Sequence, residues 1–318
     1  MHSTESSIRG FQINTTNTLP ISRTGNAPLS RWSGHVRGFF RIILASPSGI
    51  FGFSVISLFL LLAIFAPLIA PYGPFDVVYA GPHAVIRLSP PTWRNLFGTT
   101  NEGMDVFSQV IWGTRVAILV GLLSSLGSVL VGTAIGLIAG YLGGPVDRVL
   151  MRLTDIAFAM PFLPFAMVVI SVVKPSLGLV ILLVVAFLWR TTARVVRAQT
   201  LSLKTRVYVR AARMSGASHG QIILRHILPS ILPISFLYMA VGVQSGVMLE
   251  SALSFLGFGS PDVQSWGAML NAAFRVGALR VAWWWGLPPS IALSLFVVAV
   301  FMLTRAYETH LDPRLRVE

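Results

Sequence analysis

The 318-residue sequence contains no cysteine and very little charge. The missing cysteine excludes disulfides, cysteine-ligated zinc and thiol catalysis. Only 11% of the residues are charged, against about 25% in an average soluble domain. Hydrophobic residues make up 54%, and long stretches carry no charge at all. This composition predicts an all-α polytopic membrane protein, because a spanning helix needs about 20 mostly apolar residues.

Motifs for nucleotide and metal chemistry are missing too. The chain has no P-loop and no His-Glu-x-x-His sequence, so we expect neither ATP binding by this chain nor enzyme activity. His219 and His226 lie seven residues apart, with no carboxylate nearby in the sequence to complete a metal site. We therefore expect no metal and no cofactor on this chain.

Lysine is nearly absent, and arginine carries most of the positive charge. Only Lys174 and Lys204 are lysine among 24 basic residues, and the formal net charge is +13. The arginines lie between apolar runs rather than on a soluble basic face, which argues against nucleic acid as a partner. Basic residues are concentrated in 1–49, 141–154, 190–229 and 305–318, which predicts that both termini are cytoplasmic.

Six apolar runs are candidates for spanning helices. They are residues 50–70, 116–140, 155–173, 176–194, 231–249 and 284–304. The fourth has a short uncharged stretch, so Arg190 and Arg194 would have to reach the inner interface or face water. We expect residues 1–45 to be a partly disordered cytoplasmic tail with a short basic helix at 36–44. The membrane domain, 46–318, then has outside loops at 72–113 and 257–283 and a cytoplasmic loop at 195–229.

Small and polar residues inside the spans suggest two further roles. Gly132, Gly136 and Gly140 recur every four residues, which predicts a helix face that a neighbouring helix can approach closely. The fifth span carries or adjoins Gln244, Ser245, Glu250 and Ser251. These could line a translocation path or bond to neighbouring helices.

The cytoplasmic loop contains the most informative run. Residues 208–229 read YVRAARMSGASHGQIILRHILP, which predicts two short helices, a bend near Gly216 and a stop before Pro229. The small residues Ala211 and Ala212 would let another protein approach closely, and the neighbouring arginines, Arg206, Arg210 and Arg213, could pair with its acids. Alternatively, an amphipathic helix could lie passively on lipid head groups.

This run resembles the "EAA" loop of permease subunits of binding-protein-dependent ABC importers. Ala211, Ala212, Gly216, Leu228 and Pro229 hold the motif positions, His226 matches the His-x-Leu-Pro ending, and Arg210 stands where the motif has Glu. The runs at 97–108, 250–257, 266–270 and 311–316 resemble the "C" type permeases of the dipeptide, oligopeptide and nickel branch. Together these similarities cover nearly the whole membrane part of the chain.

The resemblance implies a type I ABC importer fold with six spans in the cell membrane. It implies a second homologous permease, two ATPase subunits that use the ATP, and an extracytoplasmic binding protein. The coupling loop that docks on the ATPase would comprise Arg210, Ala211, Ala212, Gly216, Ala217, His226, Leu228 and Pro229. The cargo would be a short peptide, although the branch also includes nickel and sugar importers. The loop at 72–113 could contact the binding protein or simply cap the first two spans.

Two other classes compete with this interpretation. An ATP-independent secondary carrier or channel would need no partner ATPase, and a membrane scaffold would transport nothing. A proton- or sodium-coupled carrier commonly keeps an ionisable group near the middle of the bilayer. Here Asp155, Arg190 and Glu250 lie near the ends of the expected spans, which favours coupling to an external energy source.

Overall fold

The computed structural model describes residues 46–81 and 84–311, which form helices and three isolated β-bridges. The expected tail at 1–45, its basic helix and the end of the motif at 311–316 lie outside the described residues. The helices in chain order are α2 (Pro47–Ile64), α3 (Ala66–Ile69), α4 (Val106–Leu142), α5 (Gly144–Ala159), α6 (Phe162–Val172), α7 (Leu177–Leu203), α8 (Val207–Met214), α9 (His219–Ile222), the π-helix η1 (Ile223–Ile227), α10 (Leu228–Phe255), α11 (Trp266–Arg275), the 3₁₀-helix η2 (Ala278–Arg280) and α12 (Trp283–Leu311).

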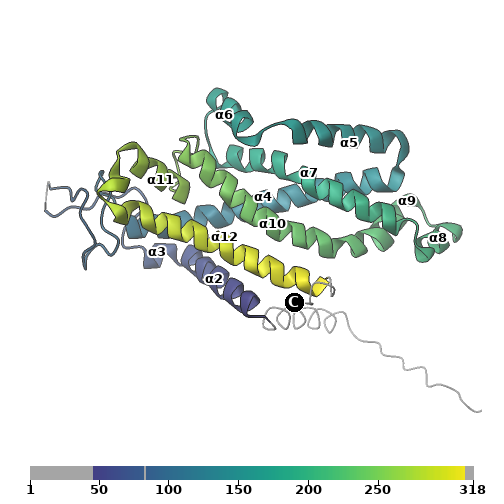
Figure 1. Ribbon diagram of the computed structural model, residues 1–318, viewed down its shortest axis with the longest axis horizontal. Helices are drawn as coiled ribbons and strands as arrows, with labels where there is room; N and C mark the ends of the chain where they lie inside the picture. Colours follow the sequence, from purple (N-terminus) through teal and green to yellow (C-terminus); the bar gives the residue numbers. More distant parts are fainter. Residues whose placement is uncertain (1–45, 82–83, 312–318) are drawn as a thin grey trace, which may run out of the picture. The chain divides into compact units, whose positions relative to one another are not determined.

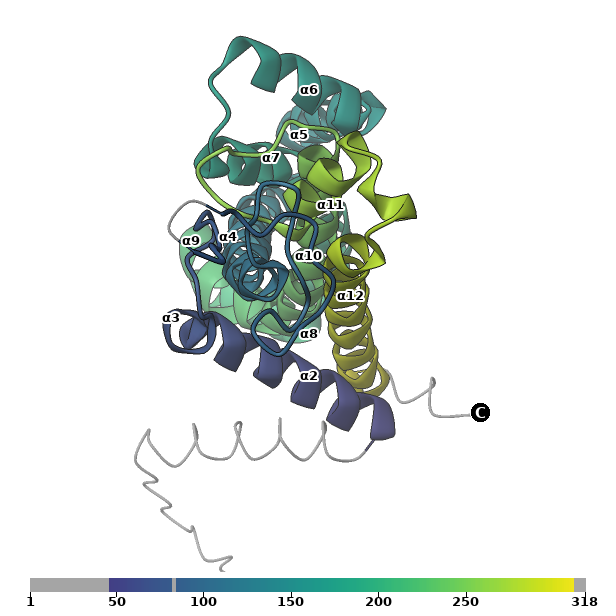
Figure 2. The same cartoon turned by 90° about the vertical axis from the view of Figure 1, so that its left-hand side faces the viewer.

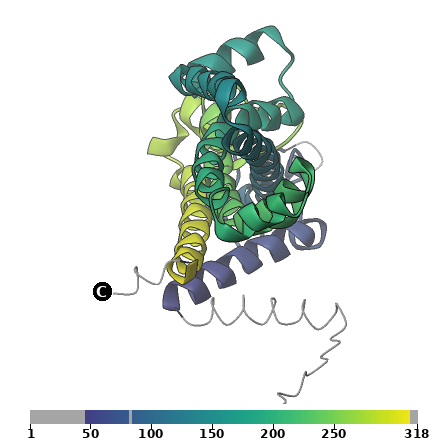
Figure 3. The same cartoon turned by 90° about the vertical axis from the view of Figure 1, so that its right-hand side faces the viewer.

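The long helices run side by side within residues 42–318. Helix α4 packs between α7 and α10, while α2 packs against α12 (Figures 1 and 2). Helices α8 and α9 lie at one end of these long helices, called here the α8 end, which Figure 3 views directly. Helix α11 lies at the opposite end, called here the α11 end (Figure 1). The expected loops at 195–229 and 257–283 therefore lie at opposite ends of the helices.

Five helices in the described residues are long and apolar enough to cross a membrane. They account for the first, second, fourth, fifth and sixth expected spans. Helix α4 has 37 residues and begins at Val106, inside the segment expected as the outside loop 72–113. Helix α7 likewise continues past Arg194 to Leu203, inside the segment expected as the cytoplasmic loop. Apolar runs thus located these helices but underestimated the lengths of α4 and α7, whereas the first run, 50–70, extends beyond α2, which ends at Ile64 and is followed by the separate short helix α3.

The third expected span, 155–173, is not one straight helix. It consists of the end of α5 and the whole of α6, and these two helices meet at an angle of 86°. The break falls at Met160 and Pro161, both of which have extended backbone angles. A residue before proline avoids helical angles, and proline offers no N–H to continue the helix. Residues 46–81 and 84–311 therefore contain five helices long and apolar enough to span a membrane, or six candidates if the bent pair is counted as one.

Three glycines of α4 bring its backbone against α7, as their spacing predicts. A Cβ atom added at Gly136 would lie 2.6 Å from the carbonyl oxygen of Ala193. Cβ atoms added at Gly132 and Gly140 would meet α7 at 2.5 and 2.7 Å. These distances are shorter than a real Cβ contact, so the two backbones pack this closely only because the side chains are absent.

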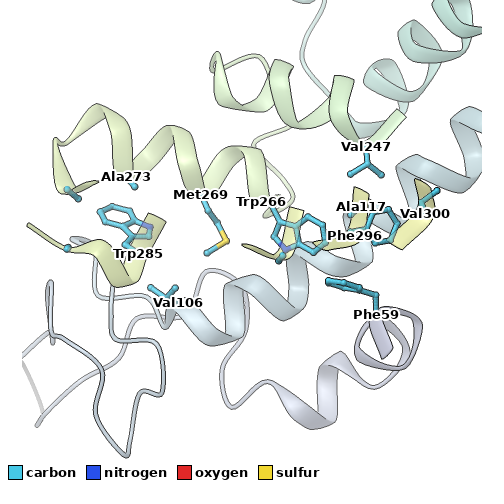
Figure 4. Packing of buried hydrophobic residues seen from close by; sticks show 13 residues of the cluster. Phe59, Val106, Ala117, Val247, Trp266, Met269, Ala273, Trp285, Phe296 and Val300 are labelled. Atoms are coloured by element: carbon cyan, nitrogen blue, oxygen red, sulfur yellow. The ribbon is translucent and has the colours of Figure 1, made fainter. Parts of the chain in front are cut away.

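An aromatic cluster joins the helices near the α11 end (Figure 4). The indole of Trp266 packs edge-on against Phe59, with ring centroids 5.6 Å apart, and lies 6.1 Å from Phe296. Its Nε1 donates to the carbonyl of Val110 at 3.0 Å. Helices α2, α4, α11 and α12 thus share one buried cluster, which holds α11 in place.

The segment between α3 and α4 is a folded cap. Asp105 caps α4 by accepting hydrogen bonds from the backbone N and the Oγ of Ser108 at 2.8 and 2.7 Å. Its other carboxylate oxygen accepts from Asn95 at 2.8 Å. The Nε1 of Trp112 donates to the carbonyl of Tyr72 at 3.1 Å. The segment therefore folds against the start of α4, while a cap over both of the first two spans and a contact with a binding protein stay predictions.

Candidate coupling surface

The coupling segment begins where α7 ends at Leu203 and consists of α8, a turn, α9 and η1. One side of it is anchored in a buried cluster. Val209, Ile222 and Ile227 are fully buried, and they pack with Leu137 and Tyr141 of α4. Because each short helix contributes a buried side chain, movement of α8 or α9 must disturb the ends of the long helices.

Polar contacts add to this anchor. The hydroxyl of Tyr141 lies 2.9 Å from Nδ1 of His219, at the start of α9. The ammonium of Lys204 donates to the carbonyl of Gly140 at 2.7 Å. Tyr141 was not singled out in the sequence, because its partner lies 78 residues away and no local pattern connects them.

The other side of α8 is exposed. Val207 and Met214 retain 78% and 87% of their accessible surface, and Ala211 is exposed beside them. Three exposed arginines lie on or next to the helix, namely Arg206, Arg210 and Arg213. The run from 195 to 229 contains no acidic residue, so positive charge is not balanced within the segment. A helix that is anchored on one side and bare on the other is suited to contact another protein.

The turn after α8 confirms the expected bend at Gly216. This residue has a φ angle of +83°, a conformation that glycine adopts without strain. The N–H of Ala217 donates to the carbonyl of Ala212 at 3.1 Å, which closes the end of α8. Ser218 and Gln221 then form a capping box that starts α9.

The same run, 216–220, spells Gly-x-Ser-x-Gly, which is also the pattern of a hydrolase nucleophile elbow. That elbow requires a strand before the serine and a helix after it. Here a helix and a turn precede Ser218, and its hydroxyl accepts a hydrogen bond from the backbone of Gln221 at 3.3 Å. The serine therefore serves as a helix cap.

The expected helix stop before Pro229 is wrong. The π-helix η1 leads directly into α10, and the N–H of Leu228 donates to the carbonyl of Ile223 five residues earlier. Pro229 occupies the first turn of α10, where a missing N–H is tolerated. Leu228 packs against the buried cluster, and His226 is half-buried. The end of the motif thus joins the coupling segment to α10 without a break.

Three arginines on α7 contact α5. Arg197 forms a two-pronged ion pair with Asp147, at 2.5 and 2.6 Å. Arg194 pairs with Asp155 at 2.9 Å in an exposed position. Arg190, which the sequence placed at an interface or in water, is instead buried between the two helices. These contacts fasten α5 to the half of α7 nearer the coupling segment.

The four polar residues predicted for a translocation path fall into two pairs on α10. Gln244 and Ser245 are partly exposed. Glu250 and Ser251 are buried, and the carboxylate of Glu250 accepts hydrogen bonds from Ser254 at 2.6 Å and from Ser251 at 3.3 Å. Among the described residues, no group of three or more His, Cys, Asp or Glu side chains could hold a metal ion.

Known proteins resemble this chain over most of its length. Residues 132–317 match the family described as binding-protein-dependent transport system inner membrane component. Residues 36–91 match the N-terminal TM domain of oligopeptide transport permease C. The glutathione transport system permease protein GsiD of Pectobacterium atrosepticum is 33% identical, covering 94% of this chain and 96% of that protein.

A second relative is the dipeptide transport system permease protein DppC of Bacillus subtilis, which is 34% identical and covers 81% of each chain. A solved structure of the MetNI methionine ABC transporter is 18% identical and covers 64% of this chain and 94% of that one, with a TM-score of 0.49. The family match spans more than half of the chain, and the two relatives exceed 30% identity over most of it. The chain therefore belongs to the binding-protein-dependent transport system inner membrane component family, and it is a membrane-embedded, non-catalytic permease subunit of an ABC transporter.

Proposed function

We propose that this permease carries short peptides into the cell and that α8 is the helix through which a separate ATPase drives it. Relatives at 31 to 34% identity are named for glutathione, dipeptide and oligopeptide transport, which supports a peptide cargo. The observation that carries the coupling role is the two-sided character of α8. Its Val209 is buried against the long helices, while Ala211 and the surrounding arginines remain exposed.

The proposed assembly contains four other subunits. A second homologous permease completes the pathway, two ATPase subunits bind and hydrolyse the ATP, and an extracytoplasmic binding protein delivers the peptide. The α8 end faces the cytoplasm, with both termini on that side, and the α11 end faces the binding protein. ATP-driven closure of the ATPases moves α8, and the buried cluster passes this movement to α4 and α10 as a rigid-body displacement.

The exposed side of α8 indicates the chemistry of the ATPase groove. Ala211 and Ala212 present little side chain, so the groove can approach the helix backbone closely. Arg210 occupies the position where related motifs have Glu, and Arg206 and Arg213 lie nearby. We propose that the groove carries acidic side chains opposite these arginines, since complementary charge selects the correct partner.

Substitutions at Gly216 test the coupling role. Because φ is +83°, Gly216→Val forces a β-branched residue into a strained backbone, whereas asparagine tolerates this region better. The space around the residue is open, so a clash is not expected for either variant. We expect Gly216→Val to abolish peptide-stimulated ATP hydrolysis by the purified transporter, and Gly216→Asn to retain most of it.

Two controls complete this experiment. Both variants must insert in the membrane and co-purify with the second permease, which shows that the fold survives. Ala211→Trp adds bulk on the exposed side of α8 and should release the ATPase from the complex. If Gly216→Val and Ala211→Trp both retain the ATPase and its stimulation, α8 is not the docking helix.

The path through the membrane is assigned to α10. We propose that Gln244 and Ser245 line it, because they stay partly exposed on a spanning helix. For Glu250 and Ser251, a path-lining role stays a prediction.

Uptake of labelled dipeptide into ATP-loaded proteoliposomes tests the cargo, with labelled nickel and a labelled sugar as competing candidates. Uptake of either competitor in place of the peptide would reject the peptide assignment.

A further inference from the structure

Helix α5 has two sides of different chemistry. On the side toward α7, Thr154 is fully buried and Asp147 pairs with Arg197. The opposite side, called here the outer face, carries four exposed apolar side chains spaced three or four residues apart, namely Val146, Val149, Leu153 and Ile156. This spacing places them in one stripe along the helix. Figure 1 shows α5 at the edge of the long helices, and the outer face points away from α7.

Two arginines border the outer face without a hydrogen-bond or ion-pair partner in the part of the chain that the structure describes. Arg148 and Arg152 are exposed and lie four residues apart, so their side chains are neighbours on the helix surface. The two acidic residues of α5, Asp147 and Asp155, pair instead with arginines of α7. Like charges at this spacing repel each other. The two guanidinium groups are therefore suited to hold an anion between them.

The arginines and the apolar stripe follow a fixed order along the helix. Helix α5 begins two residues after α4 ends, and Tyr141 near that end contacts His219 of α9, so α5 starts at the α8 end. Arg148 and Arg152 lie about 6 and 12 Å along the axis from Gly144. Because helical side chains lean toward the N-terminus, both guanidinium groups can reach back toward the α8 end. The apolar stripe continues beyond them, away from that end.

This order of charge and apolar surface matches a phospholipid in the leaflet at the α8 end. Two arginines can bind the oxygens of one phosphate, since each guanidinium group offers paired N–H donors. The net charge of the head group decides which phospholipid fits. Choline and ethanolamine carry a positive charge, which the arginine pair repels, whereas an anionic head group carries no such charge.

The size of the side chains in the stripe argues against a closely packed helix as its occupant. Where α4 approaches α7, glycines form the contact, as is usual for helices that pack closely in membranes. The outer face instead has a branched side chain at each of its four positions, and Val149 and Ile156 are each 60% exposed. Fluid acyl chains can fill the spaces between such side chains.

We propose that the outer face of α5 binds one anionic phospholipid. The phosphate lies between Arg148 and Arg152, and the acyl chains lie along Val149, Leu153 and Ile156. A lipid in this position braces α5 from the side opposite its ion pairs with α7. This lipid site is independent of the cargo and of the contact with the ATPase.

A fluorophore at Leu153 tests which lipid lies on this face. The chain has no cysteine, so Leu153→Cys provides a single labelling site in it, and the unmodified transporter treated in parallel gives the background from other subunits. The complete labelled transporter is placed in nanodiscs with equal amounts of phosphatidylglycerol and phosphatidylcholine, one of which carries brominated acyl chains that quench on contact. We expect the relative binding constant to favour phosphatidylglycerol about tenfold, the effect of one charge-assisted hydrogen bond.

Substitution of both arginines tests their role in this preference. Arg148→Gln combined with Arg152→Gln should lower the ratio to about one, whereas the corresponding double lysine variant should retain most of it, because lysine binds phosphate as a point charge. The unfolding temperature of the double glutamine variant should not fall, since neither arginine has a partner within the described residues. Arg197→Gln breaks the ion pair with Asp147 and should lower it.

Val168 on α6 is the matched control position for the fluorophore. It is exposed, and α6 contains no charged residue. A fluorophore at Val168→Cys should therefore be quenched equally by the two brominated lipids. Quenching there also shows that both lipids reach the surface of the transporter in the nanodisc.

A preference for phosphatidylglycerol at Leu153 that glutamine removes and lysine retains supports the lipid site. Equal quenching by the two lipids, or a preference that survives the double glutamine variant, would overturn it. If lysine loses the preference as completely as glutamine, the site does not select by charge and the anionic assignment is wrong. If neither lipid quenches at Leu153, another protein covers the outer face. If added inorganic phosphate abolishes the preference, the arginines bind free phosphate rather than a lipid.

Discussion

Arg190 donates a hydrogen bond to the carbonyl of Ala157, the acceptor that Pro161 leaves without a helical donor. In a continuous helix this carbonyl would receive the N–H of the residue four positions later, and proline has none. The guanidinium of Arg190 also stacks on Phe187, 3.4 Å from the ring centroid, and on Phe158 at 4.6 Å. A buried cation thus replaces the missing donor at the point where the third span bends.

Removing this donor should weaken the bend. We expect Arg190→Met to lower the free energy of unfolding by about 1–3 kcal/mol, because a buried carbonyl loses its partner while the apolar packing is largely kept. Arg190→Lys should lose less, since the ammonium can still donate, although it cannot stack as a planar group. The free energies of unfolding of both variants are measured by unfolding them in increasing concentrations of a denaturing detergent. If Arg190→Met is as stable as the unmodified protein, this hydrogen bond has no structural role.

The two ion pairs between α5 and α7 should differ in strength. The side chains of Arg197 and Asp147 are only 31% and 16% exposed, whereas those of Arg194 and Asp155 are 52% and 55% exposed. Exposed pairs contribute roughly 0–1 kcal/mol because water screens them. A double-mutant cycle should therefore give a coupling energy above about 1 kcal/mol for Arg197 and Asp147 and a smaller one for the exposed pair. Equal coupling energies would show that burial does not decide their strengths.

The glycine contact between α4 and α7 should not tolerate a methyl group. Gly136→Ala places a Cβ atom 2.6 Å from a backbone oxygen of α7, so the helices must separate. We expect a loss of about 1–3 kcal/mol, typical of overpacking. Gly178 is the matched control, since a Cβ atom there meets nothing within 4 Å. Gly178→Ala should be neutral or slightly stabilising, and a similar loss at both positions would contradict the close-contact explanation.

Local patterns in the sequence were sufficient for some of these features. The long apolar runs in the sequence indicate where the candidate membrane-spanning helices α2, α4 and α12 lie. The four-residue spacing of Gly132, Gly136 and Gly140 indicates a close contact with a neighbouring helix. The bend at Gly216 also follows from local signals, because glycine there precedes a serine that can cap the next helix. In each case the cause lies within a few residues of its effect.

Other features depend on contacts that are distant in sequence. The sequence shows that Arg190 lies near the end of an apolar run, but its acceptor is 33 residues earlier. The proline in the third span indicates a possible break, yet membrane helices often tolerate proline when neighbours supply new hydrogen bonds. The π-helix before Pro229 likewise has no local sequence signature, and its Ile227 is buried in a cluster with Leu137 and Val196, which are distant in the sequence.

The contact between Tyr141 and His219 should determine how firmly the coupling segment is held. Tyr141→Phe keeps the buried ring but removes the hydroxyl that lies 2.9 Å from Nδ1 of His219. Losing a hydrogen bond of about 1 kcal/mol should raise the local opening of α8 and α9 about fivefold. Hydrogen–deuterium exchange of residues 207–222 should accelerate by that factor in the purified transporter. Tyr79→Phe, at an exposed tyrosine in the cap before α4, is the control and should leave this exchange unchanged. If Tyr141→Phe also leaves it unchanged, this hydrogen bond does not anchor the segment, and the buried apolar side chains together with the contact of Lys204 to Gly140 hold it in place.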